Sequence, residues 1–218
     1  MFIGHYSTAL VAKAIAPKAP FWVFILAVQL VDVAWALFVM FGIEGVRFDT
    51  SLASNPLDLY HMPYSHSLVA TLVWSLGTFV VLRTFARHYL SVQEATVIAL
   101  VVASHWVADV LVHRPDLLIW GDLKIGLGLW DYPVWSMLLE VGVVVLALVF
   151  LLSRDSFNYR IKRSMLIFGI ILVMLQLSIL VIPPPLQVVE LSLTGLLFFL
   201  GLPLLAWAMV DRKSRLNM

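Results

Sequence analysis

Six long apolar stretches constrain the fold of this chain more than any other feature of its sequence. Each is long enough to cross the hydrocarbon core of a bilayer, which takes about 20 residues in a helix. They cover residues 21–42, 66–86, 94–112, 134–152, 165–182 and 187–210. The sequence therefore predicts an all-α polytopic bundle of about six transmembrane helices, with residues 1–218 forming a single integral membrane domain.

The composition supports a membrane location and excludes several other classes of protein. Hydrophobic residues make up 62% of the chain and charged residues 12%, whereas a soluble domain carries about 25% charged residues. The chain contains no cysteine, which excludes disulfides and thiolate metal sites. Its net charge of +1 supplies no basic region, so we expect no nucleic-acid partner.

A seventh apolar segment, residues 2–16, precedes the six long ones and is too short to span a bilayer comfortably. It ends at Pro17-Lys18-Ala19-Pro20, where the two prolines predict a break in the helix. We expect a short, half-inserted helix that forms a hairpin with 21–42. The segment lacks a basic region before an apolar core, so it does not have the pattern of a cleavable signal peptide.

Lysine and arginine are distributed unequally between the two ends of the predicted helices. Arg47, Arg114 and Lys124 lie at one end. The other end carries the remaining basic residues, Lys13, Lys18, Arg83, Arg87, Arg154, Arg160, Lys162, Arg163, Arg212, Lys213 and Arg215. Because cytoplasmic loops are enriched in Lys and Arg, this asymmetry predicts that both termini are cytoplasmic and that loops 43–65 and 113–133 face outward. We expect an integral protein of a bacterial inner (plasma) membrane.

Several polar residues interrupt the apolar segments at nearly the same depth. At 1.5 Å per residue, His5, Asp32 and His105 each lie about 20 Å from the basic end of the bundle. The same count brings three further polar side chains close to this level, Asp109, Glu140 and Gln176. Ionisable residues are costly inside a membrane, so their shared depth indicates a functional site.

The residues at this depth include good metal ligands. His105, Asp109 and His113 are spaced four apart and share one face of a helix. His66 enters its span at the predicted outer end, so we expect the mouth of the cluster to open outward. Imidazole and carboxylate ligands without thiolates suit zinc, iron or manganese. A metal site is our main interpretation, and a structural hydrogen-bond network or a proton path is the alternative.

Four short motifs occur in the order that is found in a known family. They are Gly4-His5, Leu30-Val31-Asp32, Tyr64-Ser65-His66-Ser67-Leu68 and Ser104-His105-Trp106-Val107-Ala108-Asp109. This series resembles the predicted membrane-bound metal-dependent hydrolases, whose ligand order is similar to that of the bacterial zinc-dependent phospholipases C. The resemblance covers residues 4–113, about half of the chain.

The resemblance implies a site with one or two divalent metal ions, zinc being the expected metal. The implied ligands are His5, Asp32, His66, His105 and Asp109. The soluble phospholipases complete a three-zinc site with a later His-x-x-x-Glu motif. Ser136 and Glu140 occupy these positions here, so a third metal is not expected.

The resemblance also implies an activity and a set of catalytic candidates. The expected reaction is hydrolysis of a phosphoester in a lipid or lipid-linked substrate, approached from the outer side of the membrane. Asp32 is either a ligand or the general base, and Arg114 is placed to bind a lipid phosphate. His113 and Glu140 complete the catalytic candidates.

Two other classes of function stay open at the level of sequence. Paired intramembrane histidines can hold a haem iron, as in a haem- or quinone-binding subunit of a respiratory complex. Asp32 and Asp109 at the same level argue against that reading. A proton-coupled transporter would use Asp32, His105 and Glu140 as a relay, but the chain shows neither an internal repeat nor two matched broken helices.

Overall fold

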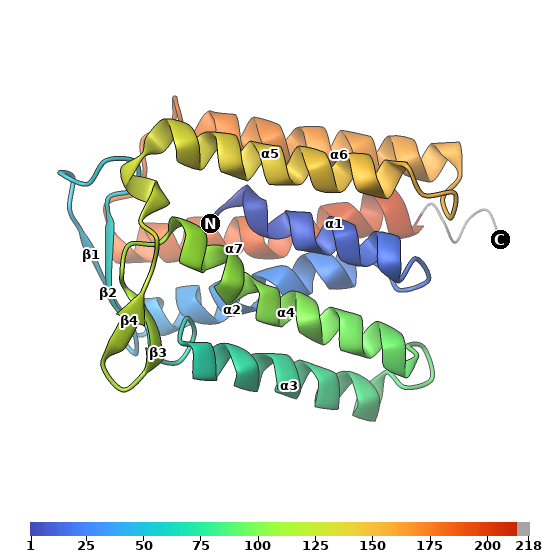
Figure 1. Ribbon diagram of the computed structural model, residues 1–218, viewed down its shortest axis with the longest axis horizontal. Coiled ribbons are helices and arrows are strands. Elements are labelled where there is room, and N and C mark those ends of the chain that lie inside the picture. Colours follow the sequence, from blue (N-terminus) through green and yellow to red (C-terminus); the bar gives the residue numbers. More distant parts are fainter. Residues whose placement is uncertain (213–218) are drawn as a thin grey trace.

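Six long helices form the body of the molecule (Figure 1). The computed structural model describes residues 1–212. Its long helices are α2 (Phe21–Met40), α3 (Leu68–Phe85), α4 (Val92–Val112), α5 (Pro133–Leu152), α6 (Tyr159–Ser178) and α7 (Val188–Ala206). A π-helical turn, Trp207–Asp211, continues α7. All six are long and apolar enough to cross a membrane, which confirms the predicted all-α membrane bundle.

The boundaries of α6 differ most from the prediction. The helix begins at Tyr159 rather than 165 and ends at Ser178 rather than 182. Asn158 caps its first turn, because the Asn158 side chain accepts a hydrogen bond from the Ile161 N–H at 3.0 Å. The prediction was wrong here because the basic residues before 165 were taken to lie outside the helix. Long basic side chains can instead extend from a helix end toward water.

The short segment before α2 forms a helix, as predicted. A 3-10 turn, Ile3–His5, leads into α1 (Tyr6–Ile15), and the chain leaves the helix at Ala16. Lys13 stabilises the break, because its Nζ donates hydrogen bonds to the carbonyls of Pro17 at 2.8 Å and Ala19 at 2.7 Å. The hairpin of α1 with α2 is confirmed, but α1 also packs against α4 and α5 and lies in the middle of the bundle (Figure 1).

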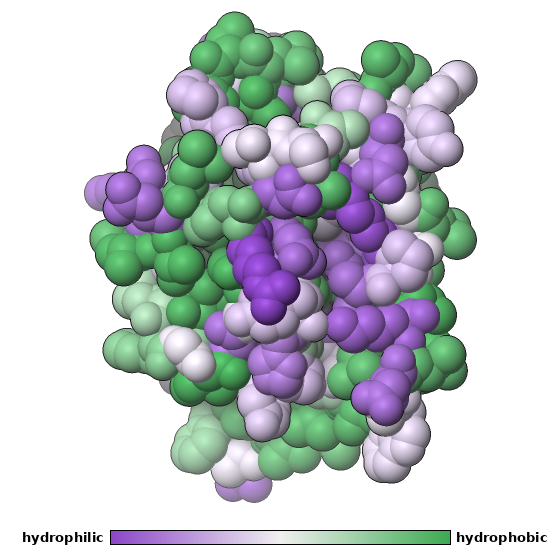
Figure 2. Space-filling model, turned by 90° about the vertical axis from the view of Figure 1, so that its left-hand side faces the viewer, coloured by the Kyte–Doolittle hydropathy of each residue, from purple (hydrophilic) through white to green (hydrophobic). Residues whose placement is uncertain are grey.

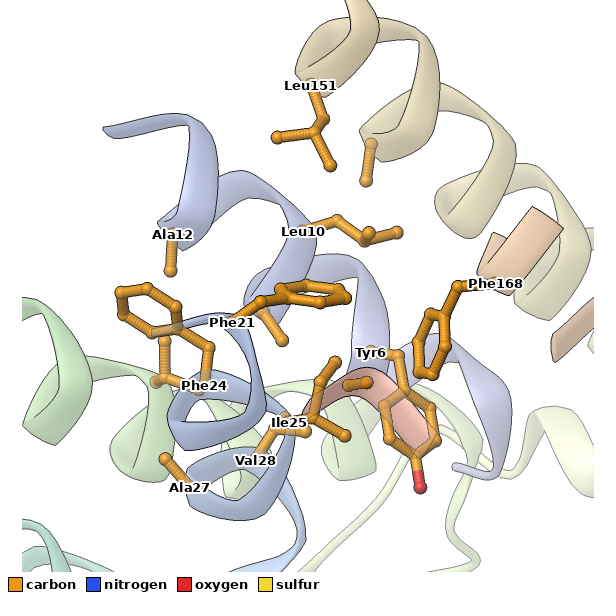
Figure 3. Packing of buried hydrophobic residues seen from close by; sticks show 14 of the residues in the cluster. Tyr6, Leu10, Ala12, Phe21, Phe24, Ile25, Ala27, Val28, Leu151 and Phe168 are labelled. Atoms are coloured by element: carbon orange, nitrogen blue, oxygen red, sulfur yellow. The ribbon is translucent and has the colours of Figure 1, made fainter. Parts of the chain in front are cut away.

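The main hydrophobic core surrounds α1. Tyr6 and Leu10 of α1 pack with Phe21 of α2, Leu151 of α5 and Phe168 of α6, and all five are buried (Figure 3). The rings of Phe21 and Phe168 meet edge to face with centroids 5.3 Å apart. Because α2, α4 and α5 all pack against α1, the core fixes the position of α1 and of the turn Ile3–His5 that leads into it.

Two small β-hairpins close one end of the bundle and were not predicted. The strands are β1 (Gly45–Phe48), β2 (Leu57–His61), β3 (Leu117–Trp120) and β4 (Leu123–Ile125), paired antiparallel as β1-β2 and β3-β4. A second buried cluster includes Leu59 and Leu117 from these strands and Trp35 and Trp106 from α2 and α4. Figure 2 views this hairpin end, where hydrophilic residues gather between hydrophobic ones.

The described basic residues follow the division expected from the sequence. Arg47, Arg114 and Lys124 belong to the hairpin end, and the others lie at or near the turns at the opposite end (Figure 1). Lys213 and Arg215, which the sequence assigns to the same side as these turns, lie outside the described residues. The hairpin end is therefore poor in basic residues.

Candidate metal centre

Five predicted ligands come together near the hairpin end of the bundle. His105 and Asp109 lie on α4 and Asp32 lies on α2. His5 ends the 3-10 turn before α1, and His66 stands just before Ser67, the residue that caps α3. All three histidines and Asp109 are buried, and the Asp32 side chain is 14% exposed.

Asp109 connects three of the histidines. Its Oδ1 lies 3.1 Å from His5 Nε2, and its Oδ2 lies 3.2 Å from His105 Nε2 and 3.7 Å from His66 Nε2. The α-amino group of Met1 also lies 2.5 Å from Asp109 Oδ1. Oδ2 has no hydrogen-bond partner among the described residues, so this oxygen is available to a ligand.

Asp32 approaches the cluster from the opposite helix. Its Oδ1 lies 3.3 Å from His66 Nε2 and 3.5 Å from His105 Nε2. The potential ligand atoms fall into two groups, His5 with His105 and Asp109, and Asp32 with His66 and His105. Within each group these atoms lie within 4.8 Å of one another. His105 belongs to both groups and stands at the centre of the site.

Backbone contacts orient His105 and its neighbour. Nδ1 of His105 lies 2.7 Å from the carbonyl oxygen of Val28 on α2. A carbonyl oxygen can only accept, so Nδ1 carries the proton and Nε2 directs its lone pair at the two aspartates. The rings of His5 and His105 stack with centroids 3.8 Å apart. The helix therefore fixes both the direction and the tautomer of the central histidine.

Glu44 orients His66 and was not identified from the sequence. Its buried carboxylate accepts hydrogen bonds from the N–H groups of Tyr64 at 2.8 Å and Ser65 at 2.9 Å, and from the Ser65 hydroxyl at 2.5 Å. The same hydroxyl lies 2.8 Å from His66 Nδ1. Ser65 therefore accepts from His66 while it donates to Glu44, which leaves His66 Nε2 to face Asp32. An acidic residue just after a predicted span looks like an ordinary solvated loop residue. Glu44 could have been identified only from the rule that a metal-binding histidine needs a partner for its second ring nitrogen.

Glu140 of α5, a predicted catalytic candidate, binds the backbone of the segment that carries His5. Its two carboxylate oxygens accept hydrogen bonds from the Phe2 N–H at 2.8 and 3.0 Å, and one also accepts from the Gly4 N–H at 2.7 Å. Gly4 has little space, because a Cβ there would lie 3.1 Å from Glu140 Oε2 and 2.1 Å from the Met1 sulfur. The glycine of the Gly4-His5 motif thus lets this backbone approach the carboxylate closely.

His113 and Arg114 extend the site toward the hairpins. His113 Nε2 lies 3.5 Å from Asp109 Oδ1, and His113 Nδ1 lies 2.8 Å from Asp116 Oδ1. Burial lowers the pKa of His113, but the carboxylates of Asp109 and Asp116 outweigh this effect and raise that pKa above its usual value. Arg114 Nε donates to Asp131 Oδ1 at 2.8 Å, while Nη1 and Nη2 are buried without hydrogen-bond partners among the described residues.

One polar residue predicted at the same depth does not join the ligand groups. Gln176 lies on α6 and is buried, and its Oε1 has no hydrogen-bond partner among the described residues. It belongs to neither group of potential ligands. The predicted depth of Gln176 in the membrane therefore did not specify whether its side of the helix points toward the cluster.

The residues present fit a divalent metal ion. Nε2 of His5, Nε2 of His105 and Oδ2 of Asp109 are all buried without hydrogen-bond partners among the described residues, which is costly in an apolar interior. Imidazole nitrogen and carboxylate oxygen are normal ligands of zinc and related ions. The two Nε2 atoms lie 3.1 and 3.2 Å from oxygens of Asp109, close to the separation of about 3–4 Å between two ligands of one zinc ion.

The candidate site therefore consists of three histidines and two aspartates that converge from four segments. Glu44 and Glu140 hold two of those segments in place. Comparisons with family models, curated proteins and solved structures find no match for the chain.

Proposed function

We propose that this protein is a membrane-embedded, metal-dependent hydrolase that cleaves a phosphoester in a lipid or lipid-linked substrate. The observation that carries the proposal is the convergence of five ligand-type side chains around buried atoms that lack hydrogen-bond partners. The order of the four sequence motifs, which resembles that of the membrane-bound metal-dependent hydrolases, supports the same conclusion. We expect zinc as the metal, with one or two ions.

Each of the two ligand groups is suited to one ion. A single ion would be held by His5, His105 and Asp109, or by Asp32, His66 and His105. His105 can give its single free nitrogen to only one ion. If two ions bind, water or a substrate oxygen would have to complete their coordination shells. When bound, such an ion polarises a phosphoryl oxygen and lowers the pKa of a coordinated water.

The surrounding side chains supply the remaining functions of a phosphoester hydrolase. Arg114 has two guanidinium nitrogens without hydrogen-bond partners among the described residues. It would bind a phosphate oxygen, for which its planar fork is well suited. His113, held by Asp116 on one side of its ring and close to Asp109 on the other, would donate a proton to the leaving oxygen. Asp32 would act as a ligand or would accept the proton of the attacking water.

The charge distribution supports an orientation of the protein in the membrane. The hairpin end carries few basic residues, whereas the opposite end carries many. By the positive-inside rule the hairpin end would face outward and the basic end the cytoplasm, as in a bacterial inner-membrane protein. The site, which lies near the hairpins, would then take its substrate from the outer leaflet.

The geometry favours this function over the alternatives. The stacked rings of His5 and His105, 3.8 Å apart, leave no room between them for a haem, and two carboxylates lie within 3.5 Å of His105 Nε2. A proton path would require Glu140 to exchange protons, but both its oxygens are engaged by backbone N–H groups. A purely structural network would have to rest on ion pairs of His5 and His105 with Asp109 at 3.1 and 3.2 Å, and neither contact forms a hydrogen bond in the structure.

The proposal is tested with the full chain purified in mild detergent. Wild type should contain stoichiometric metal by mass spectrometry and should release phosphate or a phosphorylated head group from lipid vesicles, and a chelator should abolish the release. His105→Ala should lose metal and activity but keep its helical circular dichroism. His88→Ala, at an exposed histidine outside both ligand groups, should match wild type. Gently purified wild type without metal, together with a His105→Ala variant that merely unfolds, would support a structural network instead.

A further inference from the structure

An apolar groove lies beside the candidate metal centre. It has a volume of about 500 Å³, within the range of small-molecule binding sites. One wall is the start of α3 with Val69, Val73 and Trp74, and the facing wall is β3 with Ile119 and Trp120. The groove is therefore built mainly from a long helix and a hairpin strand that contact each other.

The α3 wall of the groove faces away from the bundle. Val69 is 42% and Val73 65% exposed, and only 6% of the residues of α3 are buried. Such a helix is stable in a membrane because lipid chains cover its apolar surface. A groove with this wall opens to the hydrocarbon of the bilayer rather than to water.

Two polar side chains of the groove, Ser67 and Trp74, are already hydrogen-bonded within the protein. The Ser67 hydroxyl donates to the Pro63 carbonyl at 2.7 Å and accepts from the Ala70 N–H at 3.0 Å. Trp74 Nε1 donates to the Tyr64 carbonyl at 2.9 Å. Ser67 and Trp74 therefore offer no free polar group to a ligand, and most of the other lining side chains are apolar, so the surface of the groove suits hydrocarbon.

One loop separates the groove from the metal centre. Tyr64 and Ser67 line the groove, whereas His66, between them in sequence, is 3.3 Å from Asp32 within the cluster. A molecule that places its apolar part in the groove therefore has its polar end beside the His66 loop. Tyr64, Trp74 and Trp120 are aromatic residues of the kind that gather where chains meet head groups.

We propose that this groove binds one hydrocarbon chain of a lipid and thereby directs the head group of that lipid to the metal centre. Chain binding stands on the shape and lining of the groove alone. The delivery of the head group rests on the proposed function. The bilayer-facing wall favours a lipid over a soluble ligand, and the mostly apolar lining favours its chain over its head group.

The test uses the full chain in vesicles of phosphatidylethanolamine and phosphatidylglycerol that contain a phosphatidylglycerol with a diazirine in one acyl chain. After illumination, mass spectrometry locates the labelled residues. We expect the label to concentrate on residues 63–74 and 118–121, which form the two walls, and to be sparse on the rest of α3. Equal labelling along the whole lipid-facing side of α3 would overturn the proposal, because it would indicate unspecific contact with surrounding lipid.

Two matched substitutions on one face of α3 sharpen the test. Val73→Trp places a large side chain in the groove, and Val80→Trp makes the same change two turns further on, outside it. Both side chains are exposed, so neither change disturbs the core. Val73→Trp should reduce labelling of both walls roughly tenfold, the effect of displacing about two methylene groups. Equal labelling in the two variants would contradict the proposal.

A second copy of the chain is the competing occupant. The natural chain has no cysteine, so Val73→Cys gives a single reporter in the groove. Oxidation that joins two chains efficiently at this position in vesicles would show that another protein molecule fills the groove, and would refute lipid binding there. Chains that stay single would support the lipid.

His105→Ala separates this proposal from the hydrolase function. Its groove should be labelled as in wild type even when its metal is lost. Groove labelling in a wild type that neither binds metal nor hydrolyses lipid would uphold chain binding and refute the hydrolase. Uniform labelling in a metal-dependent hydrolase would do the reverse.

Discussion

His5 and His105 stack face to face, with ring centroids 3.8 Å apart and ring planes 9° from parallel. The two residues belong to different segments, and their partners differ. His105 Nδ1 lies 2.7 Å from the Val28 carbonyl, whereas His5 has no hydrogen-bond partner for either ring nitrogen among the described residues. His5 therefore depends for its position on its backbone, on the stack, on the Asp109 carboxylate 3.1 Å from its Nε2 and on any ion at the site.

His5 and His105 belong to different numbers of ligand groups, so replacing each one should change the metal content differently. His105 belongs to both ligand groups and His5 to only one. We expect His105→Ala to retain no metal, and His5→Ala to retain the ion held by Asp32, His66 and His105. Metal-to-protein ratios by mass spectrometry measure this difference, with His88→Ala as the control. Unchanged metal in both variants would place the ion elsewhere.

Metal binding should stabilise the fold. Because an ion that binds only the folded state adds about 2.7 kcal/mol at 100 times its dissociation constant, zinc should raise the unfolding temperature of chelator-treated wild type. The same addition should leave His105→Ala unchanged. Thermal unfolding in detergent gives both values. An equal shift in the two proteins would mean that zinc binds outside the cluster.

Glu44 should matter for metal affinity, although it acts on the candidate ligands only through the loop that carries His66. Glu44→Gln keeps the size of the side chain but puts an amide donor where the carboxylate accepts from Ser65. We expect metal affinity to fall on the order of 10- to 100-fold, the usual effect of losing a residue that orients a ligand. Titration with zinc measures this. Asp122→Asn, at an exposed hairpin residue, is the control and should bind as wild type does.

Glu140 should affect stability more than chemistry. In Glu140→Leu the N–H groups of Phe2 and Gly4 lose their acceptor, and each buried donor left unpaired costs about 1–3 kcal/mol. Glu140→Gln keeps an acceptor oxygen and should be milder. Thermal unfolding of the metal-free variants compares the two. Equal unfolding temperatures for Glu140→Leu and wild type would show that these bonds contribute little.

The membrane orientation can be tested with single cysteines, because the chain has none. Asp122 is exposed at the hairpin end and Asp155 at the opposite end. In intact cells an impermeant thiol reagent should label Asp122→Cys but should label Asp155→Cys only after the membrane is opened. The reverse pattern would place the site on the cytoplasmic side.

Regular helices made much of the site predictable. Since each residue adds a constant 1.5 Å to a helix, counting along the chain was enough to place His5, Asp32 and His105 at one level. The i, i+4 spacing likewise placed Asp109 on the same face as His105. The structure brings all four together.

Irregular segments limited the prediction. Helix counting put His66 near the mouth, but its loop folds inward because Glu44 binds two of its backbone N–H groups. The hairpins β1-β2 and β3-β4 have strands of three to five residues, too short to give a clear alternating pattern. Gln176 shows the remaining limit, since depth alone does not specify the rotation of a helix about its axis.

The hydrogen bond between the Gly4 backbone and Glu140 can form only late in the synthesis of the chain. The two residues are 136 positions apart, so the segment that carries His5 is synthesised long before its acceptor on α5 exists. A nascent chain that ends after α4 already contains all five candidate ligands, yet it lacks the carboxylate that holds one of them in place. The hydrogen bonds that hold the His5 segment can therefore form only once α5 has been made and has joined the bundle.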